Sequence, residues 1–356
     1  MRIRYAVVSA ILMGLLGNAH GEQAMAKQAA EDAAGPCATI PHLDHPHVVL
    51  KSGDLQVLIF LPDAKNGYYR AQRFDWAGVI GCASWRGHTY WGEWFRHYDP
   101  LINDSITGPV EEFRPPEGAQ GYNAAPVGGE FVKIGVGVLR KTSDAQYEFG
   151  SSYPIVDTGR WTVRSGRDSI TFRQRVMAPN GIAYLYTKRL SLNRDGSGLR
   201  LEHTLKNLGK QPIETDVYDH DFFMLDGQPT GPGFVLHLSF APKAEDSLGP
   251  KVSIEGNEIR YVAEVNPGET VAGYLTGYES RQSGYSIRLE NTRTHNIIEQ
   301  TADRPISRFY LWSIHSTISP EAYIHLSVPP GQSQSWTIAY RFSESNASTG
   351  GNQGAN

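Results

Sequence analysis

Cysteine and methionine are scarce in this 356-residue chain, which contains two cysteines and five methionines. Two cysteines do not make a metal site. Cys37 and Cys82 either pair in an oxidising compartment or stay as buried free thiols. A disulfide would pin the N-terminal segment to the body of the protein.

A block of basic residues is also missing. The formal net charge is −4, and lysine and arginine are not concentrated in any segment. This composition argues against a nucleic acid or an anionic membrane as the partner. The histidines lack the His-x-His and His-x-x-x-His spacings of metal ligands, so we expect no metal and no cofactor.

One apolar run stands at the N-terminus, and nothing after it resembles a transmembrane segment. Arg2 and Arg4 precede the apolar residues 6–16, and the small residues of 19–21 give a cleavage site. This pattern is typical of a secretory signal peptide. We therefore expect residues 1–21 to be removed and the mature protein to be periplasmic or secreted, with no membrane anchor.

The remainder divides by composition. Residues 22–36 form a loose, alanine-rich leader, residues 37–344 are predicted to form one large domain, and the polar tail 345–356 is expected to be disordered. The oligomeric state is left open by the sequence.

Sustained helical periodicity is absent, and alternation of apolar and polar residues takes its place. It is clearest in residues 169–176, 198–208 and 335–342. Turn signals such as Pro-Asn-Gly and Asp-Gly separate these runs. The sequence thus predicts an all-β fold, either a large antiparallel β-sandwich or a barrel.

Residues 81–130 are dense in Trp, Tyr, Gly, Pro and acidic residues and show little periodicity. We interpret them as ordered loops that line a cleft. Aromatic rings beside carboxylates and arginines suit a sugar, because the rings stack on its apolar face while polar groups bind its hydroxyls.

The segment ETDVYDHDFF (214–223) places a histidine between two aspartates. On a strand, Asp216, Tyr218 and His220 would share one face. That face is either an ordinary solvent-exposed surface or part of a cleft. His203, which alternates with leucines, is interpreted as a core histidine.

Two segments resemble the aldose 1-epimerase (galactose mutarotase-like) family. LEHTLKNLGKQPIETDVYDHDFF is similar to its pair of strands ending in Asn/Asp-His-x-Tyr/Phe-Phe, and IHSTISPEAYI (314–324) is similar to a segment near its C-terminus. The resemblance covers the C-terminal half of the chain well and the N-terminal third poorly. It implies the galactose mutarotase-like supersandwich with a sugar cleft.

The resemblance also implies a reaction. In the family, an acid protonates the sugar's ring oxygen while a base takes the proton of the anomeric hydroxyl, so that the ring opens and recloses. The match places His220 in the position of the acid, with Asp216 or Asp219 able to hold its tautomer.

The base is less well defined. The family's catalytic Glu falls on His315, and Glu321 takes the position of a later Asp. The family's early His-Gly-Gly motif is missing, and GPVEEF (108–113) offers Glu111 and Glu112 in its place. We therefore expect His315, Glu111 or Glu112 to face His220 across a cleft.

Other residues are candidates for binding the sugar. Arg73 binds a hydroxyl or a carboxylate, or else extends over a neighbouring ring. Tyr122 stacks on a sugar or packs in the core. Asp216 and Tyr218 share the face of His220, and Glu111 is a further candidate.

Three functions remain open. The first is an exported carbohydrate-active isomerase that interconverts the anomers of a mono- or oligosaccharide. The second is a non-catalytic carbohydrate-binding protein on the same fold. The third is a polysaccharide lyase or related glycan-processing enzyme, in which Arg70 and Arg73 would neutralise a uronate carboxylate.

Overall fold

Strands make up almost all of the regular structure in the computed structural model, which describes Cys37 and residues 40–279 and 283–345. Within these residues the strands form four sheets, and every pairing is antiparallel. The all-β prediction is therefore confirmed. The predicted signal peptide (1–21) and leader (22–36), and nearly all of the predicted tail, lie outside the described residues.

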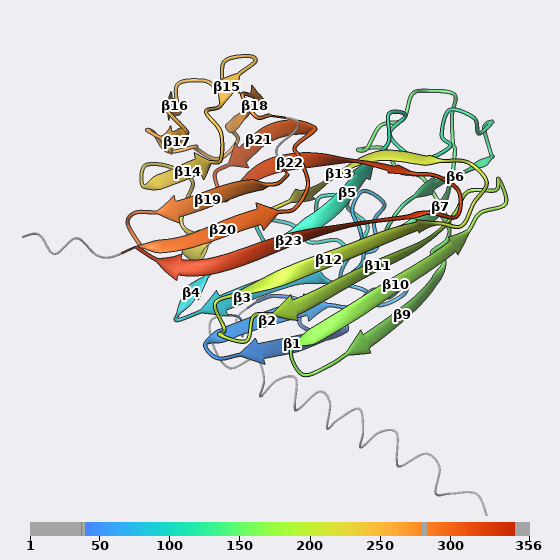
Figure 1. Ribbon diagram of the computed structural model, residues 1–356, viewed down its shortest axis with the longest axis horizontal. Coiled ribbons are helices and arrows are strands. Elements are labelled where there is room, and N and C mark those ends of the chain that lie inside the picture. Colours follow the sequence, from blue (N-terminus) through green and yellow to red (C-terminus); the bar gives the residue numbers. More distant parts are fainter. Residues whose placement is uncertain (1–36, 38–39, 280–282, 346–356) are drawn as a thin grey trace, which may run out of the picture.

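The largest sheet has ten strands and forms one layer of a sandwich (Figure 1). Its strands, in spatial order, are β16 (Val252–Glu255), β17 (Glu258–Tyr261), β14 (Phe234–Leu238), β19 (Tyr285–Asn291), β20 (Asn296–Ala302), β23 (Ser333–Glu344), β12 (Gly198–Asn207), β11 (Ala183–Leu192), β10 (Ser169–Met177) and β9 (Arg160–Ser165).

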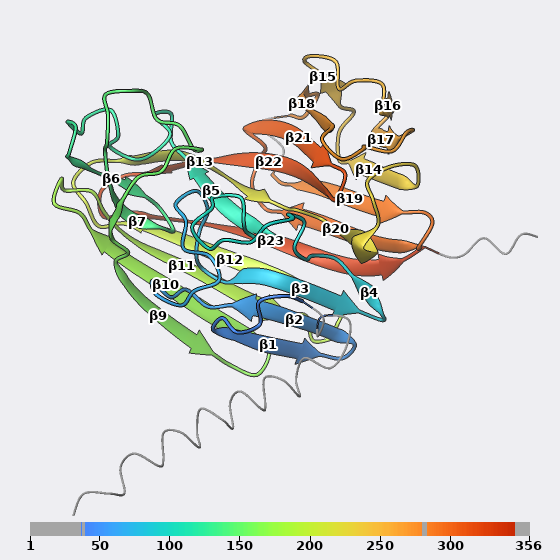
Figure 2. The same ribbon diagram turned by 180° about the vertical axis from the view of Figure 1, so that it is seen from behind.

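The other layer, seen from behind in Figure 2, contains a six-stranded and a four-stranded sheet. The six strands, in spatial order, are β15 (Lys243–Ala244), β18 (Thr270–Thr276), β21 (Arg308–Ile314), β22 (Thr317–Val328), β13 (Ile213–His220) and β5 (Val110–Arg114). The four are β1 (His47–Ser52), β2 (Leu55–Phe60), β3 (Val79–Trp85) and β4 (His88–Thr89).

A small three-stranded sheet and a short 3₁₀ turn complete the regular structure of the described residues. They are β6 (Glu130–Lys133), β7 (Gly137–Arg140), β8 (Ile155–Asp157) and η2 (Leu225–Gly227). In the part of the chain that the structure describes, no helix is long and apolar enough to span a membrane.

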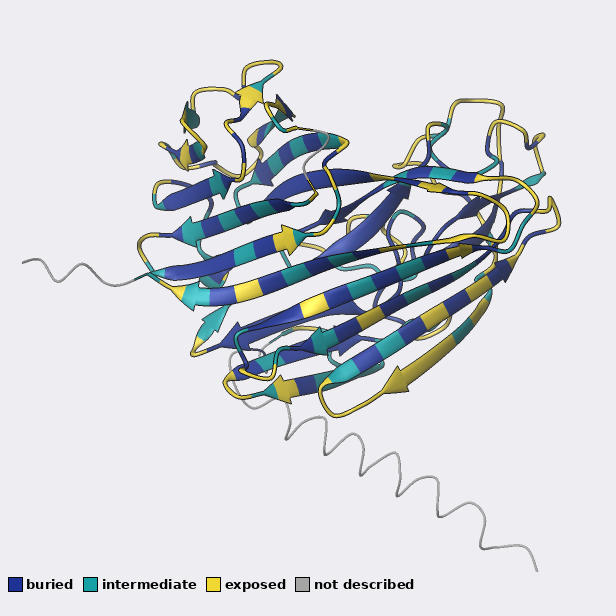
Figure 3. Ribbon diagram, in the orientation of Figure 1, coloured by how far each residue is buried: buried dark blue, intermediate teal, exposed yellow. Residues whose placement is uncertain are grey.

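Alternation along the strands produces the two layers. In β10, Ile170, Phe172 and Val176 are buried, while Arg173 and Arg175 are exposed. The same pattern runs along β12 and β23, as predicted, and it appears in Figure 3 as alternating buried and exposed bands. The apolar sides of the sheets meet in one large hydrophobic core.

This core also encloses polar groups. The Tyr340 hydroxyl on β23 lies 2.7 Å from Oδ2 of Asp219 and 2.7 Å from Oδ1 of Asp221. A phenol has one proton to donate, so the second contact is a hydrogen bond only if one carboxyl group carries a proton. His203 lies in this interior, as predicted, with Nδ1 3.1 Å from the Tyr186 hydroxyl.

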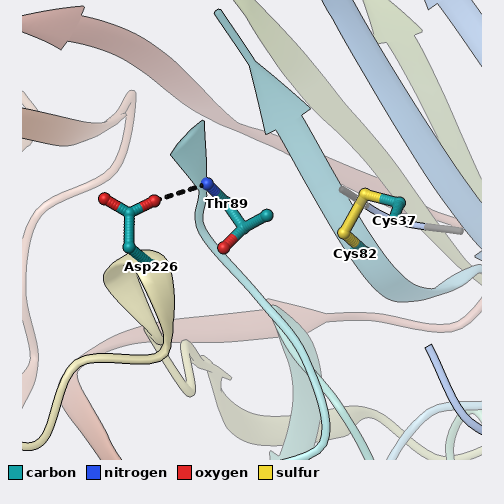
Figure 4. Close-up of a disulfide and its surroundings, with 4 residues drawn as sticks. All are labelled: Cys37, Cys82, Thr89 and Asp226. Atoms are coloured by element: carbon teal, nitrogen blue, oxygen red, sulfur yellow. Dashed lines mark hydrogen bonds between the residues drawn. A yellow bond between two sulfur atoms is a disulfide. The ribbon is translucent and has the colours of Figure 1, made fainter. Parts of the chain in front are cut away.

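A disulfide joins Cys37 to Cys82 in β3, with a Cα–Cα distance of 5.8 Å (Figure 4). The first of the two sequence-based alternatives, the paired state, is thus confirmed. On the same side of the molecule, the carboxylate of Asp226 in η2 accepts hydrogen bonds from the Thr89 amide (2.8 Å) and pairs with Nδ1 of His88 (2.8 Å). These links fix the four-stranded sheet and the chain that precedes it.

Candidate active site

The candidate site lies on the outer face of the six-stranded sheet. On β13, Asp219 points inward and reaches Tyr340 in the opposite layer. Because side chains alternate along a strand, Tyr218 and His220 point outward. Asp216, Tyr218 and His220 therefore share one face of the strand, as predicted. Loops cover this face at Tyr218 and His220, which are both buried.

These loops enclose a cavity of about 440 Å³ above the sheet. Loops between β2 and β5 and between β7 and β8 supply part of its wall, and β5, β13, β18, β21 and β22 supply its floor. Its lining residues are Arg73, Trp94, Asp104, Arg114, Phe149, Tyr218, His220, Phe222, Tyr274, Tyr310, Trp312, Glu321 and Tyr323.

His220 and Glu321 form a contact pair in this cavity. Nε2 of His220 lies 3.3 Å from Oε1 of Glu321, and each side chain is only about one-twentieth exposed. On the other side of the ring, Nδ1 lies 2.8 Å from the Ser319 hydroxyl, which also accepts a hydrogen bond from the Asp221 amide. The Tyr323 hydroxyl donates to Oε2 of Glu321 (3.1 Å).

Burial sets the protonation of the pair. Removal from water disfavours charge, so it lowers the pKa of His220 well below its ordinary value and raises the pKa of Glu321 to about 8. At neutral pH the imidazole is therefore neutral and the carboxyl group is protonated. The two side chains together hold one exchangeable proton between a donor and an acceptor.

Aromatic rings surround the imidazole. Phe222 stacks on it at 3.7 Å between centroids, and Trp312 and Phe74 meet it edge-on at 5.3 and 5.7 Å. Trp94 in turn stacks on Phe222. The cavity thus presents flat apolar surfaces beside a few polar groups, which is the combination that binds a sugar ring.

Arg73 crosses the cavity wall and is held by two carboxylates. Its Nε donates to Glu112 Oε2 (2.9 Å), and Nη1 donates to Asp104 Oδ1 (2.7 Å). Tyr218 also donates to Glu112 Oε2 (2.6 Å). Arg73 and Tyr218, both predicted to bind the sugar, therefore line the same cavity as His220.

Glu112 does not fit the predicted role of base. Its side chain is completely buried, and Arg73, Lys133 and Tyr218 all contact the carboxylate. Despite desolvation, the cations Arg73, Lys133 and Arg114 lower the pKa of Glu112 well below its usual range. It is an anchor for Arg73 and Tyr218 rather than a group that exchanges protons.

His315 is also misplaced by the sequence-based prediction. It lies in the turn between β21 and β22, where Nδ1 contacts the Val265 carbonyl oxygen (2.9 Å), and it is not part of the cavity lining. Trp312 points into the cavity, whereas Ser313 points to the interior and accepts a hydrogen bond from Tyr261.

Glu111 and Tyr122 lie away from the cavity. Glu111 points into the sandwich interior, where it pairs with Lys188 and where its Oε1 lies 3.2 Å from Nε2 of His203 without hydrogen-bond geometry. Tyr122 is buried and packs edge-on against Phe131, and its hydroxyl donates to a backbone carbonyl. Neither of these two residues, both predicted to bind the sugar, lines the cavity.

The alternation of residues along β22 could have identified the site residues on this strand that the sequence-based prediction did not include. Along β22, polar or aromatic side chains alternate with apolar ones and share one face: Thr317, Ser319, Glu321, Tyr323 and His325. The last three of these line the cavities. The sequence does not locate the hairpin between β21 and β22, so the predicted partners of His220 were His315, Glu111 and Glu112, whereas the structure places Glu321 beside it.

No protein-family model matches the sequence, and a search of curated proteins finds no match. Solved structures do resemble the fold. A candidate aldose 1-epimerase from Escherichia coli K12 gives a TM-score of 0.53 at 12% identity, covering 84% of this chain and 99% of that chain. An aldose epimerase homologue from C. elegans gives 0.53 at 14% identity, with 84% and 99% coverage.

A galactose mutarotase-like protein from Clostridium acetobutylicum gives a TM-score of 0.51 at 10% identity, covering 84% of this chain and 95% of that chain. These identities show a shared fold and leave the activity to be argued from the site. The chain therefore has the galactose mutarotase-like β-sandwich that the sequence resemblance implied.

Proposed function

We propose that this chain interconverts the anomers of an aldose by acid–base ring opening. The observation that carries the proposal is the His220–Glu321 pair, which holds one proton at the bottom of an aromatic cavity. The fold shared with aldose epimerase-like proteins supports a sugar as the substrate.

The reaction needs one donor and one acceptor near the anomeric carbon. O1 and O5 of a pyranose are bonded to the same carbon, so two adjacent side-chain atoms can address both. Glu321 gives its proton to O5 while Nε2 of His220 takes the proton of O1–H. The C1–O5 bond breaks, O1 becomes an aldehyde oxygen, and the reverse transfers close the ring after rotation about C1–C2.

This assignment exchanges the roles that the sequence resemblance implied, in which His220 was the acid. Burial favours a neutral imidazole, which accepts a proton, and a protonated carboxyl group, which donates one. Ser319 stabilises this state if Nδ1–H donates to its hydroxyl, because Nε2 is then free to accept.

Mutarotation of freshly dissolved α-glucose and α-galactose, followed by polarimetry, tests the proposal. We expect wild-type protein to accelerate the reaction and His220→Ala to lose about 100-fold or more of that acceleration. His237→Ala is the matched control, since His237 on β14 also contacts a glutamate, Glu258, but does not line the cavity. It should retain the wild-type rate.

Three results would contradict the proposal. A wild-type rate no faster than buffer, with sugar still bound, would indicate the non-catalytic binding protein. New ultraviolet absorbance from an unsaturated product would indicate a lyase. Full activity in His220→Ala would remove the histidine from the mechanism.

We further propose that the protein acts outside the cytoplasm. The signal-peptide pattern of residues 1–21 supports export, and so does the disulfide between Cys37 and Cys82, because disulfides persist in oxidising compartments. Fractionation of the producing cells, with the N-terminus of the recovered protein determined, tests this.

A further inference from the structure

A second cavity, of about 710 Å³, adjoins the first. Arg114 and Phe149 line both, so the two spaces meet at these side chains. The first cavity already contains the proton-sharing pair and the rings suited to one sugar. The second therefore offers room for further residues attached to that sugar.

Arg308 lines the second cavity, and at least one of its hydrogen-bond donors has no partner among the described residues. Its guanidinium stacks over the ring of Tyr323 at 4.1 Å. Nη2 is 3.8 Å from Oδ2 of Asp216, which is longer than a hydrogen bond, and Nε is buried with no hydrogen-bond partner among the described residues. A buried donor without a partner is costly unless a ligand fills that role.

Arg114 lies at the junction of the cavities. Its Nε is 3.8 Å from Oε1 of Glu112, again beyond hydrogen-bond distance, and the guanidinium interacts with the Tyr323 hydroxyl. Arg114 and Arg308 therefore both contact Tyr323, whose ring also forms part of the first cavity. Each of the two arginine side chains is slightly more than one-third exposed to solvent.

Among the described residues, the carboxylates that line the second cavity form no hydrogen bond with Arg114 or Arg308. Glu117 accepts hydrogen bonds from the amides of Gly121 and Asn123 (2.6 and 2.9 Å). Asp216 is in contact with Nδ1 of His325 (3.0 Å). Glu148, which also lines the second cavity, is exposed and makes no side-chain ion pair in the described part of the chain.

We infer that the substrate is an acidic oligosaccharide, with a uronate carboxylate bound by Arg308 and Arg114. This inference rests on the proposed function, because it places the reducing sugar at His220 and Glu321. The next residue enters the second cavity and presents its carboxylate to the two guanidinium groups. Arginine suits this ligand because its planar donors match the two carboxylate oxygens.

Calorimetric titration with paired ligands tests the inference. The probes are trisaccharides of α-1,4-linked galacturonate and of β-1,4-linked mannuronate, each compared with its carboxyl-reduced neutral counterpart. We expect at least one acidic trisaccharide to bind about tenfold or more tightly than its neutral counterpart. Added salt should weaken this preference, because both arginines are partly exposed.

Variants of the two arginines test whether these side chains cause the preference for acidic ligands. Arg308→Ala should reduce the acidic-over-neutral ratio by about tenfold, with little change for the neutral ligands. Arg114→Ala should reduce the ratio by a similar factor, although this residue also lines the first cavity. Arg189→Ala is the control, since Arg189 pairs with Glu202 on the opposite layer. An unchanged ratio in both cavity variants, or equal affinity for acidic and neutral ligands in the wild type, would overturn the inference.

The outcomes separate this inference from the proposed function. Binding is measured without turnover, so selective binding of uronates with no mutarotation would contradict only the proposed activity. Mutarotation of neutral aldoses with no preference for acidic oligosaccharides would contradict only the substrate class.

Discussion

His220 and Glu321 owe their chemistry to their surroundings rather than to their residue types. In water at neutral pH a histidine would be about one-quarter protonated and a glutamate would be ionised. In the cavity, desolvation reverses the preference of the carboxyl group and keeps the imidazole neutral. A proton donor and a proton acceptor are thereby maintained 3.3 Å apart.

Ser319 is the positioning residue for this pair. Ser319→Ala removes the hydroxyl that contacts Nδ1 of His220 and accepts the Asp221 amide. We expect kcat for mutarotation to fall about tenfold, since an unheld ring loses its orientation, while KM stays nearly constant. Steady-state kinetics measures both. A variant that loses thermal stability but keeps kcat would show a purely structural role for the hydroxyl.

At this scale the sequence predicted part of the site. The resemblance and strand parity indicated His220, and the structure shows that His220 lines one cavity together with Arg73 and Tyr218. Glu321 was matched to a later Asp of the family but was not predicted to contact His220, because that contact depends on which residue of β22 lies beside His220. That choice is set by the location of a hairpin, which the local sequence did not make clear.

Strands β13 and β22 form the element that brings the pair together. They pair antiparallel from Ile213↔Val328 to Val217↔Ile324, and the bridge Phe223↔Ile318 continues the same register. This register places Glu321 opposite His220. A slip by one residue would turn either side chain into the sandwich interior.

Gly108 keeps the end of β13 in place. A Cβ at this position would lie 2.6 Å from the carbonyl oxygens of both His220 and Asp221. Gly108→Ala must therefore displace the backbone that carries His220, and we expect mutarotation to slow by about tenfold or more. Gly166→Ala is the control, since its nearest neighbour would be 3.4 Å away. Equal rates in the two variants would contradict this.

The sequence predicted the strands more reliably than their partners. Alternation in residues 169–176, 198–208 and 335–342 identified β10, β12 and β23 with the correct buried faces. Pairing between β5 and β13, or between β13 and β22, joins segments about a hundred residues apart. Such long-range contacts have no local sequence signal.

In the molecule as a whole, the two layers of the sandwich enclose carboxyl groups that are protonated in the folded protein. Asp219 is completely buried, and desolvation, helped by the nearby Glu111, raises its pKa to about 8. Asp221 shares Tyr340 with it, and burial raises the pKa of Asp221 as well. Folding therefore takes up protons, so the stability due to these groups is complete below the ordinary carboxyl pKa of about 4 and is lost as the pH rises from there through about 8.

Asp219→Asn tests this consequence, because an amide does not titrate. We expect the unfolding temperature of the wild type to fall by several degrees between about pH 5 and pH 8, and that of the variant to fall less. Thermal unfolding followed by circular dichroism at the two pH values gives the comparison. Parallel losses in both proteins would show that Asp219 does not carry the pH dependence.

The overall architecture could be predicted from the sequence, because period-two alternation, turn residues and the family resemblance all indicated an antiparallel sandwich. The interpretation of residues 81–130 as cleft-lining loops is only partly correct. Trp94, Asp104 and Arg114 line the cavity, whereas Glu111 and Tyr122 are buried elsewhere. Which loop residues face a cavity depends on packing that composition does not specify.

The most direct test of the shared-proton pair is the pH dependence of mutarotation in the wild type and in Glu321→Gln, with Glu299→Gln on β20 as the control. Because the pKa of Glu321 is raised to about 8, we expect the wild-type rate to hold at neutral pH and to fall as the pH passes 8. In Glu321→Gln the rate should drop about 100-fold or more and lose that dependence. A glutamine variant with the wild-type rate and the same pH profile would contradict the mechanism.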